Sequence, residues 1–218
     1  MTTARATTLH RSVAWSKPGN LGVEFALVDL GADRLRAEGF AIGFDPGPYQ
    51  LEYKLQTTSE FVTSNVVVST RGDGWTRQLD LTRATDGKWI VQAEQQGTTD
   101  LPQAGGATLA LDGALDVDLG LSPLFNAMPV LRHGLHHGDG SVDFLMAWIS
   151  VPSLSVHPSP QRYRYLRARS ADERLVRFEA TGEGEDFVAD LLFDADGLVI
   201  DYPTIATRLG GPSGGNTA

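Results

Sequence analysis

The feature that most constrains this chain is a series of short runs rich in β-branched and aromatic residues, separated by turn-forming residues. Such runs, bounded by glycine, proline, aspartate and asparagine, are typical of β-strands joined by tight turns. In one run the apolar residues Tyr49, Leu51, Tyr53 and Leu55 alternate with polar ones. Because successive side chains of a strand point to opposite faces, this run has one buried and one wet face. The pattern predicts a mainly β fold built on an antiparallel sheet.

Similar runs recur along the chain, at residues 23–29, 40–44, 61–69, 142–151 and, with alternating apolar positions, as far as residue 193. Glycine and aspartate at residues 72–74 and 86–87 predict hairpin turns. The run at 142–151 is the most apolar and predicts a strand buried on both faces. Residues 201–203, Asp-Tyr-Pro, predict a last turn of helix.

Charge and composition narrow the classes of partner. The formal net charge of the 218-residue chain is −9. Binding to nucleic acid or to an anionic membrane surface depends on clustered Lys and Arg, so we expect neither partner. The chain has no cysteine, which excludes a disulfide framework, a thiolate metal site and a cysteine nucleophile. No cofactor is predicted.

The domain organisation follows from the same survey. Between residues 12 and 208 we find neither a linker nor an internal repeat of fixed period, which predicts one domain over 12–208 followed by a flexible tail at 209–218. The N-terminal residues carry no apolar segment of the secretory type, and no run approaches the roughly 18 apolar residues of a membrane span. We therefore expect a cytoplasmic protein.

One polar segment, residues 111–132, gathers acids, prolines, an amide and a cation. Asp116 and Asp118 lie two apart in an extended context, so both carboxylates share one face of a strand. That arrangement is costly unless the face is open to water, supplied with hydrogen-bond donors or paired with a cation. Arg132 is the nearest candidate in sequence. Asn126 is expected within reach of the same face.

The same segment predicts a short helix. Ser122 followed by Pro123 is typical of an N-cap with proline at the first helical position. Pro129 is expected to end the helical turn, because proline disfavours the α conformation in the residue before it.

Two further segments contain residue types that ligate metals. Residues 133–140 hold three of the five histidines, but no second ligand group has matching spacing, so we expect a solvated glycine-rich hairpin loop there. Residues 194–197, Asp-Ala-Asp-Gly, resemble the start of a calcium loop, but the remaining EF-hand ligands are missing and a turn is expected.

Three interpretations of the acids remain open at this point. Asp116, Asp118 and Asp201 could act as the paired carboxylates of a hydrolase, as glycosidases require. They could be ordinary turn caps and partners of Arg132. Alternatively they could accept hydrogen bonds from sugar hydroxyl groups, with Asn126, Gln161 and Tyr163 as further polar contacts.

A set of motifs carries a family resemblance. Asp116-x-Asp118, Ser122-Pro123, Asn126 and the segment at 129–132 resemble the signature of the bacterial family of glycolipid-binding proteins, formerly a domain of unknown function. Trp15, the segments at 22–24, 49–53, 86–89 and 161–163, and the segment at 194–203 are similar to the pattern of that family in the same order, so the resemblance covers residues 12–208.

The resemblance implies a fold and a function. It implies a β-roll or half-barrel, one long and strongly curled antiparallel sheet wrapped around a short α-helix, distantly like lipoprotein carriers. A glycolipid or other acyl ligand would lie in the concave face. The ligand-binding residues would be Asp116, Asp118, Asn126, Arg132, Gln161, Tyr163, Asp201 and Tyr202. A carboxylate-dependent hydrolase and a ligand-free dimerising domain remain the alternatives. Because an open sheet has exposed edges, we also expect a homodimer.

Overall fold

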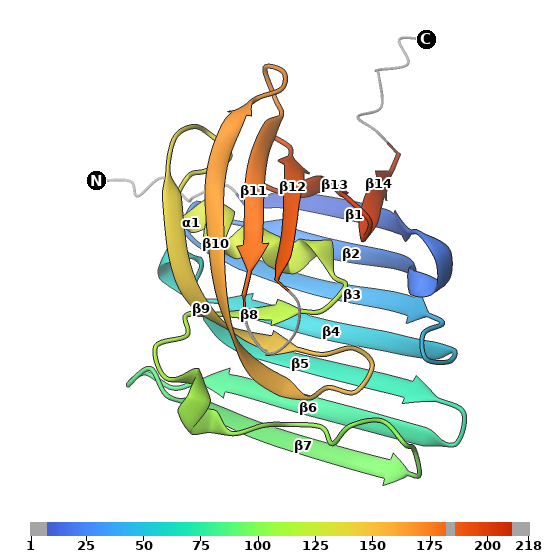
Figure 1. The fold of residues 1–218 in the computed structure, drawn as a ribbon. Helices are drawn as coiled ribbons and strands as arrows, with labels where there is room; N and C mark the ends of the chain where they lie inside the picture. The colour runs from blue at the N-terminus through green and yellow to red at the C-terminus, as the bar shows by residue number, and fades with distance from the viewer. Residues whose placement is uncertain (1–7, 182–185, 211–218) are drawn as a thin grey trace.

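The computed structural model describes residues 8–181 and 186–210. Its strands form one large sheet of 14 strands that does not close into a barrel. The sheet curls around one short α-helix (Figure 1). The prediction of a mainly β, half-barrel fold is therefore confirmed.

The elements fall into two series. The first seven strands are β1 (Leu9–Lys17), β2 (Gly22–Leu30), β3 (Leu35–Gly43), β4 (Tyr49–Thr57), β5 (Thr63–Gly72), β6 (Trp75–Arg83) and β7 (Trp89–Gly97). The later strands are β8 (Asp116–Leu119), β9 (Ser141–Ile149), β10 (Val156–Ala168), β11 (Arg174–Ala180), β12 (Phe187–Phe193), β13 (Val199–Tyr202) and β14 (Ala206–Leu209). The helical elements are α1 (Ala127–Arg132) and the 3-10 turns η1 (Gly19–Leu21), η2 (Ser59–Phe61), η3 (Thr108–Leu111) and η4 (Pro123–Asn126).

The strand order explains how the sheet wraps. It runs from β7 through β1 to β14, and then from β13 through β9 to β8. Neighbouring strands of the described chain are antiparallel except β8, which pairs parallel with β9. The first and the last strand of the sheet order therefore come from the middle of the chain, and β1 joins the two halves through β14.

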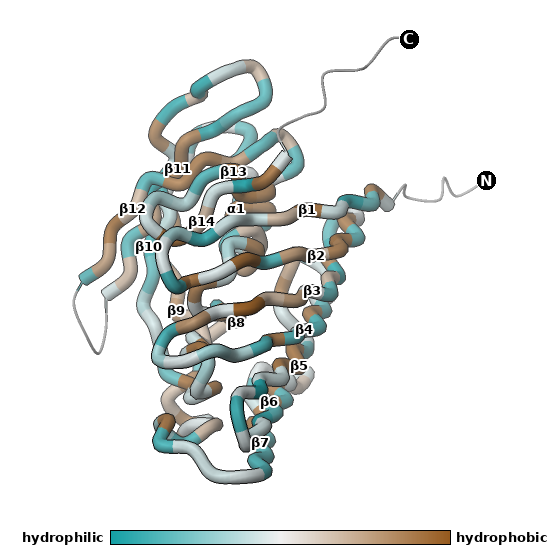
Figure 2. The backbone as a smooth tube through the Cα atoms, turned by 90° about the vertical axis from the view of Figure 1, so that its right-hand side faces the viewer, coloured by the Kyte–Doolittle hydropathy of each residue, from teal (hydrophilic) through white to brown (hydrophobic). Residues whose placement is uncertain are grey.

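The helix fills the space between the halves. Figure 2 shows α1 and β8 between the wall of β1 to β7 and the wall of β9 to β12. Met128 belongs to the hydrophobic cluster of the first wall, and Val130 belongs to that of the second. A helix that is apolar on most of its sides is stable only when it is buried. The short helix thus packs against both walls.

Several local predictions are confirmed. Residues alternate between buried and exposed along the whole of β4. The turns at residues 72–74 and 86–87 connect β5 to β6 and β6 to β7. Residues 194–197 form a turn in which the Asp194 carboxylate accepts hydrogen bonds from the backbone N–H groups of Asp196 and Leu198.

Other local predictions are wrong. Pro129 does not end the helix but lies in the first turn of α1. Backbone N–H groups in the first turn of a helix have no hydrogen-bond partner within the helix, so proline, which lacks an N–H, is tolerated there. Residues 201–203 do not begin a helix, because Tyr202 is the last residue of β13. The strand at 142–151 is β9, and it is buried on both faces only at Met146 and Ala147.

The two outermost strands differ in exposure. All four residues of β8 are buried, whereas β7 is mostly exposed beyond Trp89. The homodimer that would cover such an edge stays a prediction. Within the described ranges, none of the helices is long and apolar enough to span a membrane. Of the tail predicted at 209–218, Leu209 ends β14 and residues 211–218 lie outside the described residues.

Candidate functional site

The two carboxylates of the polar segment lie on β8, where Asp116 is opposite Met146 and Asp118 is opposite Trp148 of β9. Asp116 is 1% exposed and Asp118 is 8% exposed. The shared face is therefore not open to water. Each carboxylate needs its own protein partner, and the two find different ones.

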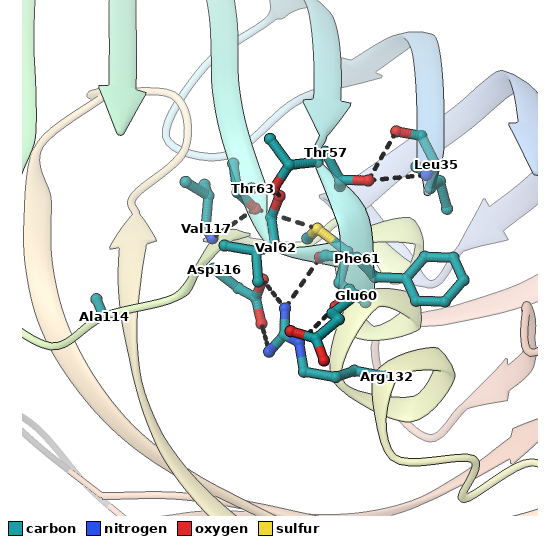
Figure 3. Close-up of polar contacts among 12 residues, drawn as sticks. Leu35, Thr57, Glu60, Phe61, Val62, Thr63, Ala114, Asp116, Val117 and Arg132 are labelled. Carbon is teal, nitrogen blue, oxygen red and sulfur yellow. Dashed lines mark hydrogen bonds and ion pairs between the residues drawn. The ribbon is translucent and has the colours of Figure 1, made fainter. Parts of the chain in front are cut away.

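Asp116 forms a bidentate ion pair with Arg132 (Figure 3), with Nη1 to Oδ2 at 2.7 Å and Nη2 to Oδ1 at 2.6 Å. The same guanidinium donates from Nε to the Glu60 carbonyl at 2.7 Å and from Nη2 to the Phe61 carbonyl at 2.9 Å. Both of these residues have positive φ angles, 58° and 55°, which are strained for side chains other than glycine. Arg132 thus ties α1 to β8 and to a strained turn. The predicted pairing of Arg132 is confirmed for Asp116.

Burial raises the pKa of the Asp116 carboxyl group, and the hydrogen bonds and the positive charge of Arg132 oppose that rise. All three nitrogens of the guanidinium are engaged. We call this arrangement of Asp116, Arg132, Glu60 and Phe61 the arginine corner.

Among the described residues, Asp118 has no ion-pair partner of this kind. Its Oδ2 accepts a hydrogen bond from the Gln161 side-chain amide at 2.7 Å. Burial raises the pKa of Asp118 to about 6, and the hydrogen bond from Gln161 opposes that rise. The expectation that Arg132 pairs with both acids is wrong, because its N–H donors are bound to Asp116 and to the Glu60 and Phe61 carbonyl groups.

The partners of Asp118 extend into the protein. The Tyr163 hydroxyl donates to Gln161 Oε1 at 3.3 Å and accepts a hydrogen bond from the Asn126 side-chain amide at 2.7 Å. Asn126 is therefore joined to Asp118 through two side chains and does not contact the acids directly. Among the described residues, the buried Asn126 Oδ1 has no hydrogen-bond partner. We call Asp118, Gln161, Tyr163 and Asn126 the amide network.

A cleft of about 480 Å³ opens beside β8. Its walls are largely apolar and aromatic, with Trp148, Val151, Phe178, Phe187, Tyr202 and Ile205 in the lining. The polar groups in the lining include Asp118, Gln161, Ser122, Ser150, His157 and Ser159. Small-molecule sites are typically concave, mostly apolar and equipped with a few polar groups, with volumes of about 300–1,000 Å³. The cleft has these properties.

The structure thus divides the eight predicted site residues. Asp118, Gln161 and Tyr202 line the cleft. Tyr163 and Asn126 stand behind Gln161 in the amide network. Tyr202 packs against Phe178 and Phe187, with ring centroids 6.1 Å apart in each pair. Burial raises the pKa of Tyr202 well above its usual value.

The remaining predicted residues do not line the cleft as the structure describes it. Asp116 and Arg132 form the arginine corner. Asp201 accepts a hydrogen bond from the Thr207 hydroxyl at 2.9 Å, across the pair of β13 and β14. The structure therefore does not gather the eight residues around one cleft, because they fall into two networks and a separate strand contact; their role in ligand binding stays a prediction.

Sequence reasoning missed a buried ion cluster behind the rim of the cleft. Glu24 of β2 is 1% exposed and lies 2.8 Å from the Lys17 ammonium group. It also accepts hydrogen bonds from the Tyr53 hydroxyl at 2.9 Å and from the Ser122 hydroxyl at 2.5 Å. Ser122 occupies the predicted N-cap position before Pro123 of η4, but its hydroxyl makes no capping hydrogen bond because it donates to Glu24. The sequence did contain an indication of this burial. Glu24 lies two residues before Ala26 in β2, so the alternation of the strand places both side chains on the same buried face.

The histidine segment at 133–140 is a loop between α1 and β9 and not a hairpin. His133 and His137 are exposed, but His136 is 7% exposed and its Nδ1 lies 3.3 Å from the Val130 carbonyl. The prediction of a fully solvated loop is therefore wrong for His136. In the part of the chain that the structure describes, no three His, Cys, Asp or Glu side chains are grouped to hold a metal ion.

Comparison with known proteins adds to this geometry. A family model described as "Putative glycolipid-binding" matches residues 12–208. The chain is also similar to the crystal structure of a DUF1089 family protein from Pseudomonas aeruginosa. The two sequences are 28% identical, the match covers 89% of this chain and 95% of the other, and the TM-score is 0.65. No curated protein matches the chain.

Proposed function

Because the chain belongs to the family described as "Putative glycolipid-binding", we propose that its cleft beside β8 binds an amphipathic ligand such as a glycolipid. The observation that carries the proposal is a mostly apolar cleft of about 480 Å³ with a buried carboxylate and an amide in its wall. The apolar walls fit an acyl chain. The polar wall fits a hydroxylated head.

The aromatic part of the cleft comes from four strands of the half of the sheet that runs from β13 to β8. Trp148 lies on β9, Phe178 on β11 and Phe187 on β12, and Tyr202 follows on β13. Burial of apolar ligand surface against these side chains contributes about 25 cal/mol per Å². An acyl chain would therefore supply most of the affinity.

The polar side chains of the cleft would orient the head of the ligand. Asp118 Oδ2 accepts a hydrogen bond from Gln161, and no donor from the described residues is bound to Oδ1, so Oδ1 can accept from a donor on the ligand. Ser150 and Ser159 lie in the same lining with hydroxyl groups that both donate and accept. A sugar head presents several hydroxyl donors and acceptors close together, which matches this set.

The hydrolase alternative has little support in the geometry. A glycosidase of the usual kind needs two carboxyl groups flanking the scissile bond. Both oxygens of Asp116 are held by Arg132, and Asp118 is the one carboxylate that the described residues place in the lining. We therefore propose a binding protein rather than an enzyme.

The proposal can be tested by native mass spectrometry and calorimetric titration with dodecyl β-glucoside below its micelle concentration. We expect one molecule per cleft in the unmodified protein. Ala180→Trp, which places an indole in the lining, should abolish binding. Ala168→Trp on the exposed end of β10 is the matched control and should bind normally. Equal binding by both variants would show that the cleft is not the site, and release of glucose during incubation would favour the hydrolase.

A further inference from the structure

The charged side chains that line the cleft are of one sign. Asp118 is the acidic residue of the lining, and the described lining contains neither Lys nor Arg. The titratable groups beside it are His157 and Tyr202 in the lining and Tyr163 in the amide network. Tyr163 and Tyr202 both feel the Asp118 charge, which contributes to raising their pKa values. The fixed charge that a ligand head meets is negative.

Three cations on elements described above are already bound to other groups. Arg132 is held by Asp116 and by the Glu60 and Phe61 carbonyl groups. The Lys17 ammonium group is 2.8 Å from Glu24, and the two side chains are 4% and 0% exposed. On the same wall, Arg162 of β10 is paired with Asp143 at the exposed surface. Any of these three cations could neutralise an anionic head only if its present pair broke.

We propose that Asp118 makes the cleft selective for amphiphiles whose head is uncharged and donates hydroxyl groups, and that it excludes heads bearing a carboxylate or a phosphate. This inference rests on the proposed function, since it concerns the same cleft. It narrows the ligand class from acyl compounds in general to neutral hydroxylated lipids.

The physical reason is the difference between two interactions of one buried carboxylate. A hydroxyl that donates to an ionised carboxylate makes a charge-assisted hydrogen bond, which is roughly twice as strong as a neutral one. A second anion close to Asp118 is repelled, and the partly buried setting weakens the screening of that repulsion by water. The Asp118 carboxylate therefore attracts a head that donates hydroxyl groups and repels a head that carries a negative charge.

The test uses two amphiphiles with the same chain length, dodecyl β-glucoside and dodecanoate, titrated calorimetrically at pH 8. The unmodified protein should bind the glucoside at least roughly tenfold more tightly than dodecanoate, which corresponds to one charge-assisted hydrogen bond. In Asp118→Asn the affinity for the glucoside should fall and that for dodecanoate should rise. The amide can still accept from Gln161, so the wall is preserved.

Asp143→Asn is the matched control, because it removes the same charge from an exposed position; it should leave both affinities unchanged. Dodecanoate binding as tightly as the glucoside in the unmodified protein would overturn the selectivity while leaving the proposed function intact. An Asp143→Asn effect equal to that of Asp118→Asn would also overturn it, because the effect would then come from net charge. Binding of neither amphiphile would overturn the proposed function and the selectivity with it.

Discussion

Asp116 and Asp118 lie two residues apart on β8, are both buried, and have opposite surroundings. Asp116 is enclosed by a guanidinium that also binds two carbonyl groups, whereas Asp118 is met by an amide and faces the cleft. The comparison teaches that a shared strand face does not imply a shared role. The first carboxylate joins elements of the fold, and we propose that the second offers an acceptor to a ligand.

The largest expected effect comes from opening the arginine corner. Arg132→Ala leaves the buried Asp116 without its cation and the Glu60 and Phe61 carbonyl groups without their donor. Breaking a buried pair by removing one partner costs about 3–5 kcal/mol, and we expect a loss of that size in the free energy of unfolding measured by urea denaturation.

The matched control for that variant is Arg162→Ala. Arg162 pairs with Asp143 at 2.6 Å, but the two side chains are 51% and 68% exposed. Exposed pairs contribute less than about 1 kcal/mol. Equal losses in the two variants would mean that the arginine corner behaves as an ordinary surface pair.

Asp118 should behave in the opposite way, because its charge is a cost to the fold. Its pKa in the folded protein is about 6, above the usual value of an aspartate. Between about pH 4 and pH 6 the folded state keeps a proton that the unfolded state releases, so stability falls as the pH rises. Above pH 6 this loss of stability is complete. A pKa shift of this size corresponds to up to about 3 kcal/mol in the free energy of unfolding.

Asp118→Asn should therefore raise the free energy of unfolding at pH 8 and leave it nearly unchanged at pH 4. Urea denaturation of both proteins at the two pH values measures this. A variant that is less stable at pH 8 than the unmodified protein would show that the Asp118 charge is compensated in the fold.

A smaller effect is expected from Tyr163→Phe, which removes the hydroxyl between Asn126 and Gln161. It leaves the buried Asn126 side chain without a partner, at a cost of about 1–3 kcal/mol. Tyr165→Phe, two residues further on β10 and half-buried, is the control and should change stability by less than about 0.5 kcal/mol. Thermal melts of the two variants are compared, and equal shifts would argue against the amide network.

Much of the fold follows from local pattern. Alternation along β4 and the turns after β5 and β6 depend on neighbouring residues, and the sequence contains that information. The pairing of Asp116 with Arg132 could be expected as well, because two acids on one strand face favour a nearby cation. The helix through Pro129 was missed because proline is tolerated in the first helical turn.

The site itself depends on long-range register. Gln161 meets Asp118 although the two are 43 residues apart, and that contact follows from the parallel pairing of β8 with β9 and the antiparallel pairing of β9 with β10. A shift of one residue would turn every side chain of a strand to the other face. The walls of the cleft come from six strands, β8 to β13, in the same way. The single domain over 12–208, the cytoplasmic location and the homodimer stay predictions.

The most direct test of the difference between the two carboxylates is carbon-13 NMR of the aspartate carboxyl groups, with the Asp116 and Asp118 signals assigned from their asparagine variants. Addition of saturating dodecyl β-glucoside should shift the Asp118 signal and change its titration midpoint from about 6. The Asp116 signal, enclosed by Arg132, should stay where it is. A ligand that shifts Asp116 as much as Asp118, or that leaves Asp118 unchanged while it binds, would contradict this account.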